Sequence, residues 1–134
     1  MEIRKAITAD VKGVHSLLEN EKNTSWTVGN FNEATRHKDS IFYVAEKDGK
    51  IVGYVIGYIC PGKKEDCMLA ETRVKESERN KNIGKKLVET FCKGAFARGS
   101  KSIYTYATEK HIRFYSKTGF KKSKNQWIEM VKTK

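Results

Sequence analysis

Two apolar runs in the middle of the chain limit its possible folds more than any other feature. Residues 41–45 and 51–60 are rich in β-branched and aromatic side chains, and Asp48-Gly49 stands between them. An Asp-Gly pair readily adopts the positive φ angles of a tight turn, so the two runs predict an antiparallel hairpin. The second run is apolar at both alternating sets of positions, which indicates a central strand covered on both faces. A sheet flanked by helices is therefore expected.

The flanking segments predict the elements that complete a single domain, residues 1–134, of the α/β (α+β) class. Before the hairpin we expect a strand from Ile3, a helix capped by Thr8 and a weaker helix near residues 30–37. After it we expect a strand at 67–74, a long helix with Ile83, Leu87, Phe91 and Ala95 on one face, a strand at 102–107, a helix from Thr108 to Gly119, and strands at 120–122 and 127–131. The predicted order is β-α-α-β-β-β-α-β-α-β-β around one mixed sheet.

The net charge of +11 is confined to the second half of the chain. Residues 1–67 contain ten Lys/Arg and ten Asp/Glu, whereas residues 68–134 contain seventeen and six. Such asymmetry indicates that the second half binds a polyanion, which could be a nucleic acid, a membrane surface or a multiply phosphorylated cofactor.

Several classes of protein are disfavoured by what the sequence lacks. No apolar run approaches the roughly 20 residues that span a bilayer, and the N-terminus lacks the basic-then-apolar layout of a signal peptide. The three cysteines have no CxxC spacing, and the three histidines are scattered at no ligand spacing. An odd number of cysteines in a chain without an export signal is typical of reduced thiols inside a cell. We therefore expect a cytoplasmic protein without a metal site or membrane contact.

A basic loop and the start of the long helix form the most informative stretch, residues 74–87. The N-terminus of a helix presents unpaired N–H groups and a partial positive charge, which favour a bound phosphate. Gly84 would let a ligand approach the backbone, and Asn80 and Asn82 tolerate left-handed conformations. Basic side chains surround these positions: Arg79, Lys81, Lys85 and Lys86. The alternative interpretation is a solvated loop before an ordinary amphipathic helix.

Two motifs resemble those of the GNAT N-acetyltransferases. Arg79-Asn80-Lys81-Asn82-Ile83-Gly84 resembles the family's pyrophosphate loop, Arg/Gln-x-x-Gly-x-Gly/Ala. Residues 108–120 resemble its Asn-x-x-Ala-x-x-Phe-Tyr-x-x-x-Gly-Phe segment. The predicted element order is also the family's order, so the resemblance covers essentially the whole chain. It implies that acetyl-CoA is the acyl donor, that no metal is used, and that the protein is a monomer or homodimer.

The resemblance also implies which residues bind the cofactor. They are Thr72, Arg73 and Val74 on the strand, the loop and helix start, Arg79, Asn80, Lys81, Asn82, Ile83, Gly84 and Lys85, and Thr108 and Tyr115 on the later helix. Three positions depart from the family pattern: Asn82 replaces the middle glycine, Thr108 an asparagine, and His111 a small residue. These departures leave open a non-catalytic relative that still binds an acyl-CoA.

Tyr115 is the candidate general acid, because the departing CoA thiolate needs a proton and the family uses a tyrosine here. The alternative is a core aromatic beside Phe114. The general base is less obvious, because the two strand positions where family members carry a glutamate hold Met68 and Ile103. Glu71 is the nearest carboxylate and is the candidate base, with deprotonation through water as its competitor.

The acceptor is expected to be a primary amine of a protein or small molecule, attacking the thioester directly in a ternary complex. A backbone N–H near Val74 would stabilise the oxyanion. Trp26, Tyr104 and Tyr106 are the candidate acceptor-site residues, although ordinary packing explains each of them as well. A basic nucleic-acid-binding domain is a weaker alternative, because no RNP-type or helix-turn-helix signal accompanies the lysines.

Overall fold

A computed structural model describes residues 1–21, 24, 26–125 and 128–134 of the chain. In these residues, strands form one sheet in the order β1-β2-β3-β4-β5, antiparallel except for the parallel β4–β5 pair. The strands are β1 Glu2–Lys5, β2 Ser40–Lys47, β3 Lys50–Ile59, β4 Asp66–Val74 and β5 Ser102–Tyr104. The helices are η1 Thr8–Asp10, α1 Val11–Ser16, α2 Val28–Arg36, η2 Glu76–Glu78, α3 Ile83–Ala97 and α4 Glu109–Lys117. The predicted α/β class with a mixed sheet flanked by helices is confirmed.

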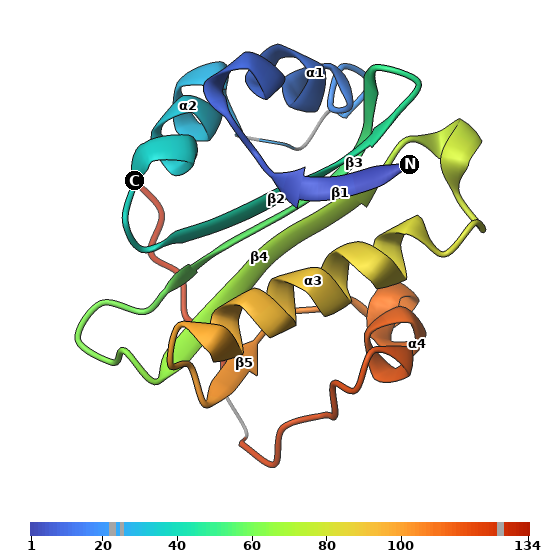
Figure 1. The fold of residues 1–134 in the computed structure, drawn as a ribbon. Helices are drawn as coiled ribbons and strands as arrows, with labels where there is room; N and C mark the ends of the chain where they lie inside the picture. The colour runs from blue at the N-terminus through green and yellow to red at the C-terminus, as the bar shows by residue number, and fades with distance from the viewer. Residues whose placement is uncertain (22–23, 25, 126–127) are drawn as a thin grey trace.

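The β2–β3 hairpin forms where the sequence predicts it. Lys47 pairs with Lys50, and the turn residues Asp48 and Gly49 have φ angles of 51° and 76°. The β3 strand is covered on both faces, as Figure 1 shows, with α1 and α2 on one side of the sheet and α3 and α4 on the other. Val55 and Ile59 belong to the core under α3, and Tyr54 and Ile56 belong to the core under α1 and α2.

Helix α3 buries its predicted apolar stripe completely. Ile83, Leu87, Phe91 and Ala95 are each at most 4% exposed. The Phe91 ring lies directly over Gly57 of β3, where even a methyl group would be 2.5 Å from ring atom Cζ and would overlap the Met68 carbonyl oxygen. Only glycine at position 57 lets α3 pack this close to the sheet.

Strand β4 separates from β5 after a short stretch of pairing. Residues Asp66–Met68 pair with Ser102–Tyr104, and the next pairing is replaced by a hydrogen bond of 3.0 Å from the Thr105 hydroxyl to the Leu69 carbonyl. The β5 strand is therefore shorter than the predicted 102–107. On its other edge, β4 has a bulge: Gly57 pairs with Leu69 and Ile56 with Glu71, which leaves Ala70 as the extra residue.

Two predicted strands near the C-terminus are not found. Residues 120–125 and 128–134 form no helix or strand, and Trp127 lies outside the described residues. Ile128, Met130 and Val131 are 86%, 91% and 78% exposed. The alternation of apolar residues predicted a strand. These side chains are exposed, so no burial of apolar surface offsets the conformational entropy that forming a strand would cost.

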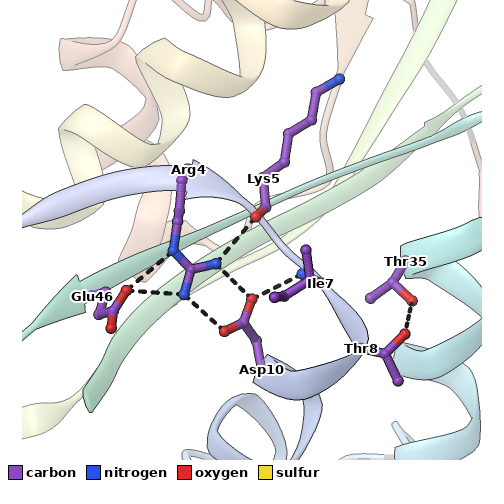
Figure 2. A network of polar contacts seen from close by, with 7 residues as sticks. All are labelled: Arg4, Lys5, Ile7, Thr8, Asp10, Thr35 and Glu46. Atoms are coloured by element: carbon purple, nitrogen blue, oxygen red, sulfur yellow. Dashed lines mark hydrogen bonds and ion pairs between the residues drawn. The ribbon is translucent and has the colours of Figure 1, made fainter. Parts of the chain in front are cut away.

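A partly buried ion pair fixes the start of the chain to the sheet (Figure 2). The Arg4 guanidinium on β1 donates to both Asp10 carboxylate oxygens at 2.8 and 2.9 Å, and to Glu46 on β2 at 2.9 Å. Asp10 also accepts the Ile7 N–H at 2.8 Å, so Asp10 caps this turn. Thr8, the predicted cap, instead bonds to Thr35 of α2 at 3.3 Å.

We predict that Gly57→Ala destabilises the protein by about 3 kcal/mol, the upper range for overpacking a core, because neither the Met68 backbone nor the Phe91 ring can move freely. Urea unfolding of the two proteins measures the difference. Gly29→Ala is the matched control: its new methyl group would lie 3.6 Å from the Thr27 hydroxyl inside α2, and it should be neutral or slightly stabilising. Equal stability of both variants would contradict the packing assigned to Phe91.

We predict that Asp10→Asn costs about 2 kcal/mol near neutral pH, the scale of hydrogen bonds to a charged group. The Arg4 hydrogen bonds lower the pKa of Asp10 in the folded protein. The contribution of Asp10 to folding stability is therefore complete above the pKa of an unfolded Asp, near 4, and is lost as the pH falls through the lower pKa of the folded state. The stability difference between wild type and variant should be constant from about pH 5 to 8 and shrink in more acidic solution. Asp48→Asn, at an exposed turn position, is the matched control and should change the stability by less than about 0.5 kcal/mol.

Candidate active site

Tyr115 lies beside the part of β4 that β5 leaves uncovered. Its hydroxyl donates to the Thr72 hydroxyl at 3.5 Å. The edges of the rings of Phe114 and Phe120 hold its ring in place, with centroids 4.9 and 5.5 Å away. Tyr115 is partly buried, so its phenol is fixed while its hydroxyl faces the strand.

The backbone of β4 presents N–H groups at this open edge. The Lys75 N–H donates to the Val52 carbonyl of β3 at 2.8 Å. Backbone groups of an antiparallel strand alternate in direction, so the N–H groups of Val74 and Thr72 point away from β3 and toward the open edge. The Arg79 guanidinium donates to the Val74 carbonyl at 3.1 Å, which agrees with this direction.

The loop between β4 and α3 has the backbone conformation that its asparagines favour. Asn80 and Asn82 have φ angles of 65° and 63°, and Asn82 is the N-cap residue of α3. Asn82 therefore adopts at the family's glycine position a conformation that glycine also permits. At Gly84 a methyl group would lie 3.2 Å from the Phe114 ring, so this glycine lets α3 and α4 pack closely.

Some of the positive charge around the loop is already paired. Lys81 and Lys47 bind the Glu78 carboxylate at 3.1 and 3.0 Å, and their hydrogen bonds lower the pKa of Glu78. Lys85 is 3.9 Å from Glu89 and half-exposed. The N–H groups of the first α3 turn, with Lys85, are therefore the groups best placed for an anion.

Glu71 lies on the opposite face of the sheet, under α1 and α2. The Tyr54 hydroxyl donates to one of its carboxylate oxygens at 2.9 Å, and Arg73 donates to the other at 2.8 Å. Arg73 also binds Glu21 at 2.6 Å. Tyr54 is fully buried, and this burial with the Glu71 charge raises the pKa of Tyr54 far above its ordinary value. Its hydroxyl therefore remains a hydrogen-bond donor to Glu71.

A groove of about 420 Å³ opens on this same face. Its lining comes from the acceptor candidate Trp26, from one side of α2, and from β2, β3 and β4: Asn30, Glu33, Ala34, His37, Ser40, Ile56, Gly57, Tyr58 and Ala70. Tyr104 and Tyr106 are not part of it; they are 45% and 84% exposed. Glu33, His37 and Tyr58 were not identified as lining residues from the sequence. The helical spacing of positions 30, 33, 34 and 37 could have placed the first two on one face of α2.

The geometry thus combines an open strand edge, a helix N-terminus and a fixed phenol on one face with a groove and a carboxylate on the other. A sequence profile of the acetyltransferase (GNAT) family matches residues 11–120. The chain belongs to this family. The family resemblance and the enzyme class predicted from the sequence are confirmed.

Solved structures share the GNAT fold across the whole chain. Glucosamine-6-phosphate N-acetyltransferase from Arabidopsis thaliana has a TM-score of 0.78 at 23% identity, covering 98% of this chain and 97% of that one. The aminoglycoside acetyltransferase meta-AAC0020 from an uncultured soil metagenomic sample, in complex with sisomicin, has a TM-score of 0.77 at 17% identity, covering 98% and 95%. AAC(6')-Iy, in complex with the bisubstrate analog CoA-S-monomethyl-acetylneamine, has a TM-score of 0.81 at 13% identity, covering 98% of each chain. No curated protein matches the GNAT chain by sequence.

The described part of the chain contains neither a cluster of metal-ligating side chains nor a membrane-spanning helix. No group of three or more His, Cys, Asp and Glu side chains there could hold a metal ion. Likewise, none of the helices in residues 1–21, 24, 26–125 and 128–134 has the length and hydropathy to cross a bilayer.

Proposed function

We propose that the chain is an acetyl-CoA-dependent N-acetyltransferase that acetylates a primary amine by direct attack in a ternary complex. One observation carries the proposal: β4 has an open edge between the Tyr115 phenol on one face and the Glu71 carboxylate and groove on the other. A thioester held along this edge would be reached by the amine from the groove and by the acid from the opposite face.

The protein is proposed to act in the cytoplasm, where its three free thiols stay reduced.

The proposed cofactor site runs from the open edge to the start of α3. The N–H groups of Thr72 and Val74 would pair with the amide groups of the pantetheine arm, as a further strand would. The N–H groups of Asn82, Ile83, Gly84 and the nearby Lys85 would bind the pyrophosphate. Arg79, Asn80 and Lys81 would shape the loop, and Thr108 would border the site, whereas the Arg73 side chain lies on the opposite face with Glu71 and Glu21. At Thr108, the hydroxyl contacts the His111 ring at 3.2 Å and thereby fixes the start of α4.

Groups of this chain are proposed to stabilise the oxyanion, to protonate the sulfur and to accept the proton of the ammonium during acetyl transfer. The Val74 N–H would stabilise the oxyanion as the amine attacks the carbonyl carbon. Tyr115 would protonate the sulfur as the carbon–sulfur bond breaks. Glu71 would accept the proton of the ammonium through water, because both of its oxygens already accept hydrogen bonds from Tyr54 and Arg73. The products are the acetylated amine, CoA and one proton.

The proposal is tested by measuring CoA binding calorimetrically and acetylation with a panel of small amines and lysine peptides. We expect CoA binding and turnover with at least one amine. CoA binding without any turnover would identify the chain as a non-catalytic acyl-CoA-binding module. RNA binding that falls steeply with salt and ignores added CoA would instead favour nucleic-acid binding.

We predict that Tyr115→Phe lowers kcat about 100-fold, the lower range for loss of a general acid. CoA affinity should change less than twofold, because the ring keeps its contacts with Phe114 and Phe120. Steady-state kinetics and calorimetry measure the two effects. Tyr104→Phe, at an exposed position, is the matched control and should leave kcat unchanged. Wild-type kcat in Tyr115→Phe would remove the phenol from the mechanism.

We predict that Glu71→Gln removes the acidic limb from the pH profile of kcat/KM. As the pH rises, a carboxylic acid loses its proton and becomes able to act as a base, whereas a glutamine side chain does not ionise. The glutamine carbonyl can accept from Tyr54 or from Arg73, but its amide nitrogen cannot accept from the other, so the thermal stability of the variant is measured alongside. A pH series with saturating acetyl-CoA makes the comparison. An unchanged profile would show that another group accepts the proton.

A further inference from the structure

The groove beside α2 contains a carboxylate that the proposed reaction does not use. Glu33 lies on the groove-facing side of α2, one turn after Asn30 and one turn before His37. Among the described residues that line the groove, Glu33 is the one carboxylate and none is a lysine or an arginine. The Asp39 N–H donates to His37 Nδ1 at 3.1 Å, so this ring nitrogen is an acceptor. The groove therefore favours a positively charged group.

Two aromatic rings strengthen this preference. Trp26 is stacked on the fully buried Phe31, with centroids 5.2 Å apart and ring planes 11° from parallel. One face of the indole is thus covered by protein, and Trp26 is held in place at the groove. Tyr58 enters the groove from β3 and is 45% exposed. A carboxylate with two aromatic rings is a chemistry suited to an ammonium group.

The groove also borders the proposed reaction centre. Ala70 lines it and is the bulged residue of β4, next to Glu71 and at the point where β4 leaves β5. An acceptor amine must come to this part of the groove to attack a thioester on the β4 edge. A ligand that fills the groove therefore has its reacting nitrogen near Ala70 and its remaining part near Glu33.

We propose that the acceptor is a small aliphatic diamine, and this inference rests on the proposed N-acetyltransferase function. One amine reacts at β4, and the second stays protonated and is bound by Glu33 between Trp26 and Tyr58. In the reaction, the reacting ammonium loses its proton, its nitrogen forms a bond to the acetyl carbonyl carbon, and the carbon–sulfur bond breaks. The products are the monoacetylated diamine, which keeps one positive charge, CoA with its thiol protonated, and one proton. A volume of about 420 Å³ is within the usual range for small-molecule pockets.

The test compares α,ω-diamines of three to six carbons with the n-alkylamines of equal length, using the full chain and acetyl-CoA at pH 7.5. We expect the best diamine to have a kcat/KM about tenfold or more above its monoamine, the range of one well-placed cation contact. Glu33→Gln should remove this advantage and leave the monoamine rate unchanged. Glu2→Gln, at an exposed position on the edge strand β1, is the matched control and should behave as wild type.

Each other outcome contradicts a different statement. Equal rates for diamines and monoamines, or equal losses for both in Glu33→Gln, would overturn the diamine inference and leave the N-acetyltransferase function intact. Acetylation of a lysine peptide but of no diamine would do the same. CoA binding with no acetylation of any acceptor would overturn both the inference and the proposed catalysis. Titration of diamine into the CoA-loaded protein gives a second readout, in which Glu33→Gln should weaken binding about tenfold.

Discussion

The close contact between Phe91 and Gly57 anchors the sheet beside the place where it opens. A ring on α3 lies directly on the backbone of β3, and the β4 strand that pairs with Gly57 has its bulge at the next residue, Ala70. The bulge changes the direction of β4 where its pairing with β5 ends. The open edge is thus next to the most tightly packed part of the core. An opening in a sheet exposes backbone groups, and a rigid core beside it keeps those groups in place for a ligand.

The alternation of β4 distributes the proposed chemistry over two faces. Glu71 and Arg73 point toward α1 and α2, where Tyr54 and Glu21 bind them, whereas Thr72 points toward Tyr115. The candidate base and the candidate acid therefore lie on opposite sides of one strand, and only the open edge connects them. A shift of the β3–β4 register by one residue would turn each β4 side chain to the other face of the sheet and would break the hydrogen bonds just described. This explains why the β3–β4 interface has bulky, fully buried partners such as Tyr54 and Leu69.

Features that depend on a few neighbouring residues could be predicted from the sequence. The Asp48-Gly49 turn, the buried stripe of α3, and the left-handed Asn80 and Asn82 are of this kind, because local backbone preferences determine them. The groove was missed because it depends on which β3 residues face α2, and no local pattern contains that information. The length of β5 depends on one side chain, since the Thr105 hydroxyl takes the place of a backbone partner. The C-terminal alternation was misleading because a strand also needs a neighbour that buries its apolar side.

The unequal charge of the two halves gives the two proposed substrates separate approaches. The groove belongs to the neutral half except for Ala70, and its charged lining group is the Glu33 carboxylate. The open edge, the loop and α4 belong to the half that carries the whole excess of +11. A polyanionic acyl donor would be attracted to these basic segments, and a dication would be repelled there. The sheet separates these basic segments from the groove. Because solvent and salt screen charge over about 10 Å, the repulsion between the basic segments and a diamine in the groove would be weak. Opposite charges on donor and acceptor therefore favour a ternary complex entered from two sides.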